Sequence, residues 1–193
     1  MASLSTQTPQ ARGFDTTLNY FDSGNNYYDS TTVQDCLDPA TQEEVTGVDL
    51  WDTPGPARHL NGTYEELLFG ERAVQTIRAH PVGTPMFLYY AFHTSCTGYN
   101  ASGQGGRFDR WSSLQPLKSY YDRFPFIDQA DRRANVAMVA LMDEIVGNIT
   151  AELKAKAMWD TTLVLWSSDN GGAMHLYGGA NSYPLRGGYM NNW

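Results

Sequence analysis

The expected fold rests on the stretch Thr161-Thr162-Leu163-Val164-Leu165-Trp166-Ser167-Ser168-Asp169-Asn170-Gly171-Gly172. Its apolar run, rich in β-branched and aromatic residues, stops at a polar cluster and two glycines, a pattern typical of a strand buried on both faces. In open α/β sheets, ligands bind beyond the carboxyl ends of the strands, which is where Asp169 and Asn170 stand. Their carboxylate and amide oxygens are hard donors that suit a divalent cation. The sequence Asp169-Asn170-Gly171-Gly172 is also typical of a turn, so a turn that binds no metal is the alternative here.

Two helices and a second apolar run extend this strand into an α/β architecture. A capping box at Thr63 predicts an amphipathic helix that ends near residues 80–81. The run at 85–92 has the length and composition of a strand and also ends in a polar loop. A longer helix is predicted over about residues 128–157. Because helix, strand and loop follow one another twice, we expect parallel strands joined by right-handed crossovers, whereas residues 12–60 are predicted to be rich in loops.

Further polar side chains follow these runs. His93 stands just after the second apolar run and could act as an acid or base. Arg186, placed between Pro184-Leu185 and two glycines, could place its guanidinium against an anion. A surface histidine and a structural arginine are the alternatives for these two residues.

The composition excludes some classes of function. The chain has 193 residues and 41% hydrophobic residues, enough for one domain with a sizeable core. A net charge of −8 argues against nucleic acid as a partner, since phosphate binding calls for a basic surface. No apolar run approaches the roughly 18–20 residues that span a bilayer.

The processing signals point in two directions. The N-terminus lacks the basic start and apolar core of a signal peptide. Two cysteines, Cys36 and Cys96, could form one disulfide or stay as thiols. Three sequons for N-glycosylation favour a secretory route, and they begin at Asn61, Asn100 and Asn148.

Two blocks of sequence together resemble the sulfatase family, above all its arylsulfatase B-type enzymes, which hydrolyse sulfate esters of sugars. The first block is the run that ends at Gly172, and the second is Asn181-Ser182-Tyr183-Pro184-Leu185-Arg186-Gly187-Gly188. The resemblance extends through the 85–92 run, the helix at 135–153 and Arg12-Gly13-Phe14-Asp15. It covers nearly the whole chain.

The resemblance implies an alkaline-phosphatase-like α/β fold with a mainly parallel sheet flanked by helices. It also implies a bound calcium ion, to which Asp169 and Asn170 supply two ligands, and a sulfated carbohydrate or aryl sulfate as substrate. The family nucleophile is a hydrated formylglycine, made from the first residue of a Cys/Ser-x-Pro/Ala-x-Arg motif. Calcium and basic side chains stabilise the charge on the sulfate oxygens.

This chain departs from the family pattern at several functional positions. Neither Cys36-Leu37-Asp38-Pro39-Ala40 nor the surroundings of Cys96 match the nucleophile motif, and the family's acidic pair, Lys-x-His and Glu-Gly-Gly motifs are absent. The family's substrate-binding lysine falls on Tyr189, which lacks a positive charge. The family histidine falls on Cys96, three residues after His93.

We therefore expect residues 1–193 to be the central part of a single sulfatase catalytic domain, incomplete at both ends and inactive by itself. The parent protein would be secreted or lysosome-like. A non-catalytic, glycosylated binding module of the same fold is one alternative. A metal-dependent phosphatase or phosphodiesterase of the same superfamily is the other.

Overall fold

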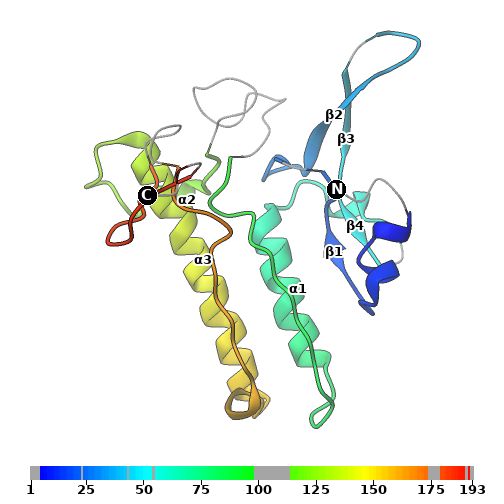
Figure 1. Ribbon diagram of the computed structural model, residues 1–193, viewed down its shortest axis with the longest axis vertical. Helices are drawn as coiled ribbons and strands as arrows, with labels where there is room; N and C mark the ends of the chain where they lie inside the picture. Colours follow the sequence, from blue (N-terminus) through cyan, green and yellow to red (C-terminus); the bar gives the residue numbers. More distant parts are fainter. Residues whose placement is uncertain are drawn as a thin grey trace. The chain divides into compact units, whose positions relative to one another are not determined.

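The computed structural model describes residues 5–22, 24–42, 44–53, 55–97, 114–173, 179–189 and 191 (Figure 1). The chain divides into two compact units. The first is drawn from Met1–Arg72 and Cys96–Gln115, and the second from Ala73–Ser95 and Pro116–Trp193. The boundary falls inside helix α1 (Glu65–Ala79), so this helix contributes residues to both units.

The first unit contains two small antiparallel sheets. Strands β1 (Leu18–Asn19), β4 (Trp51–Asp52) and β5 (Gly55–Pro56) form one of them in the order β1-β4-β5. Strands β2 (Thr31–Leu37) and β3 (Glu44–Val48) form the other, with a register shift between Gln34 and Leu37. Short 3-10 turns are η1 (Ser5–Gln7), η2 (Gln10–Arg12) and η3 (Arg58–Leu60). The prediction of a loop-rich segment over residues 12–60 was therefore wrong for these strands, which are too short or too irregular to give a clear period of two.

Stacked tyrosines form the core of the first unit. The rings of Tyr27 and Tyr64 lie 5.6 Å apart, and the Tyr27 side chain is fully buried. Burial raises the pKa of the Tyr27 hydroxyl well above its ordinary value, and the nearby charge of Glu66 adds to this shift. The carbonyl of Tyr64 accepts the first helical hydrogen bonds of α1, from the amides of Leu67 and Leu68. Tyr64 is thus the N-cap, and the predicted capping box at Thr63 begins one residue too early.

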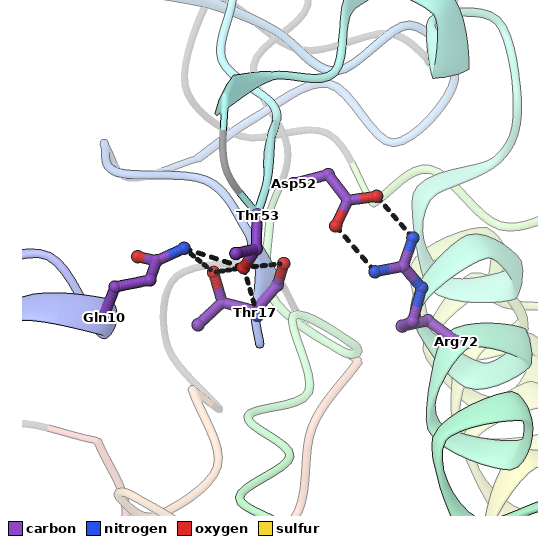
Figure 2. A network of polar contacts seen from close by, with 5 residues as sticks. All are labelled: Gln10, Thr17, Asp52, Thr53 and Arg72. Carbon is purple, nitrogen blue, oxygen red and sulfur yellow. Dashed lines mark hydrogen bonds and ion pairs between the residues drawn. The ribbon is translucent and has the colours of Figure 1, made fainter. Parts of the chain in front are cut away.

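A polar network joins the strands of the first sheet to the chain before and after them (Figure 2). The Gln10 amide nitrogen donates to Thr17 Oγ1 at 2.9 Å and to Thr53 Oγ1 at 2.8 Å. On the other side of β4, the guanidinium of Arg72 donates to both oxygens of Asp52, at 2.7 and 2.5 Å. Because both side chains are partly buried, this forked pair holds β4 against α1 better than an exposed ion pair would.

The second unit is built on helix α3 (Ala130–Ala155), close to the predicted 128–157. Its buried stripe includes Ala137, Met138, Leu141 and Ile145, and α1 contributes Ile77. At the ends of the two helices, Arg78 pairs with Glu152 at 2.7 Å, and Lys156 Nζ donates to the carbonyls of Arg78 and His80. The unit also contains α2 (Lys118–Tyr121) and η4 (Trp159–Thr161).

The two predicted parallel strands are extended segments in the second unit. Each follows a helix and runs back in the opposite direction, so the segments at 85–93 and 162–168 point the same way (Figure 1). Within the described residues neither takes part in a sheet ladder. Leu163 and Leu165 are 81% and 84% exposed, so the predicted burial on both faces was wrong. A central strand is buried by its neighbours and by layers above and below it, and the described part of the chain supplies too few of these.

Acidification should weaken the first unit through Asp52. The hydrogen bonds from Arg72 hold the pKa of this carboxyl below its ordinary value of 3.8. A carboxyl whose pKa is lowered by folding stabilises fully above its unfolded pKa, and the contribution is lost as the pH falls through the lower folded pKa. Asp52→Asn should therefore cost about 1 kcal/mol of unfolding free energy at pH 7 and much less near pH 2.

The measurement is urea unfolding of both proteins at the two pH values. Asp122→Asn is the matched control, because Asp122 pairs with Lys118 on the exposed surface and should change stability little. An equal cost for Asp52→Asn at both pH values would contradict the role given to its charge.

Candidate active site

The loop at Asp169 and Asn170 lies at the carboxyl end of the second extended segment, as predicted. Both residues are exposed. The side-chain amide nitrogen of Asn170 donates to the Gly171 carbonyl at 3.0 Å, and Ser168 Oγ donates to the backbone carbonyl of Asn170 at 2.7 Å. Because the nitrogen of the Asn170 amide is engaged by its own loop, its oxygen is the atom left to face a cation. The donor types and their exposure fit a hard divalent ion.

These two residues amount to only part of a metal site. No cluster of three or more His, Cys, Asp or Glu side chains suited to a metal occurs among the residues that the structure describes. Calcium takes six to eight oxygen ligands. Asp169 and Asn170 would therefore have to share an ion with further oxygen donors.

Gly171 and Gly172 pack against the segment at 180–189. A Cβ on Gly171 would lie 2.7 Å from the carbonyl carbon of Gly188, and one on Gly172 would lie 2.8 Å from the backbone nitrogen of Asn181. No real Cβ approaches backbone atoms so closely, so both positions need glycine. The two predicted blocks of sequence are thus in direct contact.

The backbone amide and the backbone carbonyl of Gly172 both form hydrogen bonds that stabilise this contact. Its amide donates to Ser182 Oγ at 2.9 Å, and its carbonyl accepts from the amide of Tyr189 at 3.0 Å. The segment at 180–189 therefore leaves Gly172 and returns to it. This brings Arg186, which is exposed, onto a loop anchored three residues after Asp169.

The start of this segment is anchored on helix α3. Arg132 Nη1 donates to the Gly179 carbonyl at 2.8 Å, and a Cβ on Gly179 would lie 2.7 Å from the carbonyl oxygen of Asp131. The predicted site is therefore supported by the first turn of α3 as well as by the extended segment.

His93 lies at the end of the other extended segment and is buried. The rings of Phe92 and Trp166 are 5.6 Å apart, so the ends of the two segments are near each other, as the prediction of adjacent strands requires. Asn135 on α3 donates to Ser95 Oγ at 3.2 Å and ties this second loop to the same helix. The His93 imidazole is buried. Its proposed acid–base role stays a prediction.

The other residues predicted from the sequence are the three glycosylation sequons and Cys96. Asn61 and Asn148 are exposed, so both sequons could accept a glycan. Asn100 lies outside the described residues. Cys96 is an exposed free thiol, whose carbonyl accepts a hydrogen bond from the Tyr27 hydroxyl at 3.1 Å.

One residue was missed by reasoning on the cysteines alone. Ser182-Tyr183-Pro184-Leu185-Arg186 fits the letters of the serine form of the nucleophile motif. The Ser182 hydroxyl, however, accepts a hydrogen bond from the Gly172 amide. It therefore already stabilises the loop. The letters alone could have drawn attention to Ser182, but only the structure shows this contact.

Removal of the close fit at Gly172 should loosen the loop. Gly172→Ala places a Cβ against the backbone of Asn181, which should cost about 1–3 kcal/mol of local stability. The measurement is hydrogen exchange at the Tyr189 amide, which should speed up by about fivefold or more.

Gly147→Ala is the matched control for this variant. Gly147 lies inside α3 and a Cβ there would meet nothing within 4 Å, so alanine should stabilise the helix by up to about 1 kcal/mol. Unchanged exchange at Tyr189 in Gly172→Ala would contradict the described contact.

The family model named Sulfatase matches residues 2–193 of this chain. The mouse (Mus musculus) protein arylsulfatase J is 30% identical over 186 residues, which are 96% of this chain and 27% of that protein. The human (Homo sapiens) protein N-sulphoglucosamine sulphohydrolase is 30% identical over 125 residues, which are 52% of this chain and 25% of that protein. The chain thus spans about a quarter of the length of these relatives.

Solved structures agree with the sequence comparison. The crystal structure of Ps i-CgsB in complex with k-i-k-neocarrahexaose matches with a TM-score of 0.70 and 26% identity, over 97% of this chain and 39% of that chain. A second crystal structure of Ps i-CgsB matches with a TM-score of 0.69 and 25% identity, over the same shares of the two chains.

Proposed function

Because the chain belongs to the sulfatase family, we propose that its protein hydrolyses sulfate esters with the help of a metal ion held in part by Asp169 and Asn170. The observation that supports this most is the clamp at Gly172, which joins the loop of the two oxygen donors to the loop of Arg186. Both units belong to one catalytic domain in this proposal.

The roles of the residues follow from their chemistry. Asp169 and Asn170 offer hard oxygen donors, and calcium is the ion that we propose for them. The ion would supply positive charge for the sulfate oxygens. Arg186 can donate two parallel hydrogen bonds to an oxyanion and would orient the sulfate group of a sulfated carbohydrate or aryl sulfate.

We propose that the protein works outside the cytosol. The exposed sequons at Asn61 and Asn148 support a secretory route, either to the cell exterior or to a lysosome-like compartment. No helix in the described part of the chain is both long and apolar enough to cross a membrane. The acidic net charge of −8 gives no support to a nucleic acid partner.

A non-catalytic binding module is the second candidate. The observation that favours it is Tyr189, a 40% exposed phenol at the position where the family has a substrate-binding lysine. A phenol is neutral at pH 7, so this position cannot attract a sulfate group as an ammonium does. The free thiol of Cys96, where the family has a histidine, points the same way.

The proposed metal site can be tested without any reaction. Calcium titration by calorimetry should give a dissociation constant of about 1 mM or above, at the weak end of extracellular sites, because Asp169 and Asn170 supply only part of the six to eight oxygen ligands. Asp169→Ala should weaken binding at least tenfold because it removes the charged ligand. Asp160→Asn, at another exposed carboxylate nine residues away, should leave binding unchanged. Equal binding by Asp169→Ala and the unchanged protein would exclude the site.

Turnover of a chromogenic aryl sulfate tests the catalytic half of the proposal. The 193-residue chain by itself should give no calcium-dependent turnover, because neither cysteine lies in a nucleophile motif and Ser182 Oγ is engaged by the Gly172 amide. Clear turnover would overturn the claim that this chain is inactive.

A further inference from the structure

We infer that Asn135 on α3 is a positioning residue, which joins the loop that carries His93 to the start of the loop that carries Arg186. The roles of these two side chains rest on the proposed function, whereas Asn135 holds only the spacing of their loops. The contacts of Asn135 that carry this role all lie within the second unit.

The first contact of Asn135 is with the loop of His93. Asn135 lies near the start of α3 and is buried. Its side-chain nitrogen donates to Ser95 Oγ at 3.2 Å, two residues after His93. The side chains of His93 and Thr94 are buried as well. A buried donor without a partner costs free energy, so this hydrogen bond favours one position of the loop on the helix.

The second contact of Asn135 is with Gly179, just before the loop at 180–189. A Cβ on Gly179 would lie 3.0 Å from Asn135 Cβ and 2.7 Å from the carbonyl oxygen of Asp131, so the Gly179 backbone packs directly on the helix. Arg132 Nη1 donates to the Gly179 carbonyl at 2.8 Å and holds this contact in place. Asn135 therefore touches the backbone that leads into the loop of Arg186 and also binds Ser95.

The start of α3 is itself held firmly. The side chain of Gln129 caps the helix by accepting a hydrogen bond from the Arg132 amide. Arg133 Nε donates to the Tyr121 carbonyl at 2.9 Å, and its guanidinium lies 4.0 Å from the centre of the Tyr121 ring. Packed side chains and hydrogen bonds of this kind carry energetic coupling between sites. We therefore expect a displacement at Gly179 to reach Ser95 through Asn135.

Two substitutions of Asn135 separate its hydrogen bond from its packing. Leucine has nearly the same size and keeps a Cβ against Gly179, but it cannot donate to Ser95. Aspartate also keeps the size, and it can accept a hydrogen bond from the Ser95 hydroxyl, because a serine hydroxyl both donates and accepts. A side chain that served only to fill space would be replaced equally well by either residue.

The test follows the amide signal of residue 95 by nuclear magnetic resonance in the 193-residue chain, with Gly179→Ala as the perturbation. Gly179→Ala should shift this signal in the protein that is otherwise unchanged. The shift should be lost in the Asn135→Leu background and kept in the Asn135→Asp background. Ser95→Ala removes the acceptor and should abolish the shift too, which keeps the test decisive if Asn135→Leu fails to fold. Asn148→Leu is the matched control, because Asn148 is an exposed asparagine of the same helix, and it should keep the shift.

The outcomes separate the role of Asn135 from the proposed function. A shift that persists in both Asn135→Leu and Ser95→Ala would overturn the positioning role, whatever calcium binding or hydrolysis shows. Loss of the shift in Asn148→Leu would also overturn it, because it would show a general loosening of α3. A shift that depends on Asn135, in a chain that binds no calcium, would uphold the positioning role and count against the metal site. Calcium binding that requires Asp169, without such a shift, would do the reverse.

Discussion

The candidate site depends on the two hydrogen bonds that the backbone of Gly172 makes. Its amide donates to Ser182 Oγ and its carbonyl accepts from the Tyr189 amide, so the six residues between those two are held as one loop. Without this clamp, the oxygen donors at Asp169 and Asn170 and the guanidinium of Arg186 would be on separate, unconnected loops. The absence of a Cβ at Gly171 and Gly172 is what allows the two backbones to meet.

Ion pairs on α1 show how the scaffold of each unit is stabilised. In the first unit, Arg72 binds Asp52 on β4, and in the second unit Arg78 binds Glu152 on α3. The first pair is partly buried and forked, so it fixes β4 more firmly than its short ladder alone could. In the second unit, Lys156 adds two hydrogen bonds to carbonyls near the end of α1. The candidate loops at 169–172 and 180–189 belong to this second unit.

Sequence patterns predicted the two helices and the closeness of the ends of the two apolar runs well. Apolar residues at helical spacing placed the long helix within two residues of α3 at each end, because a long amphipathic stripe is the strongest local signal. The residues at the ends of the apolar runs also proved to lie together, as shown by Phe92 and Trp166. Contacts such as that between Gly172 and Ser182 could not be predicted, because nothing local in the sequence specifies which distant backbone a glycine will touch.

Strands were predicted less well, for two different reasons. The short strands β1, β4 and β5 have two residues each, which is too few for any periodic pattern. The apolar run at Leu163 and Leu165 is extended as expected but exposed, because burial depends on layers that local sequence does not describe. The similarity to Ps i-CgsB over 97% of the chain nevertheless supports the sulfatase fold for this arrangement of helix and extended segment.

The central claim is that Asp169, Asn170 and the loop clamped to Gly172 form one ion-binding unit. Amide signals followed by nuclear magnetic resonance during a calcium titration would test it most directly. The account predicts that the signals of residues 169–172 and of Tyr189 shift together at the same calcium concentration, while that of Gly147 in α3 stays in place. Calcium shifts confined to other parts of the chain, or shifts at residues 169–172 that leave Tyr189 unaffected, would contradict it.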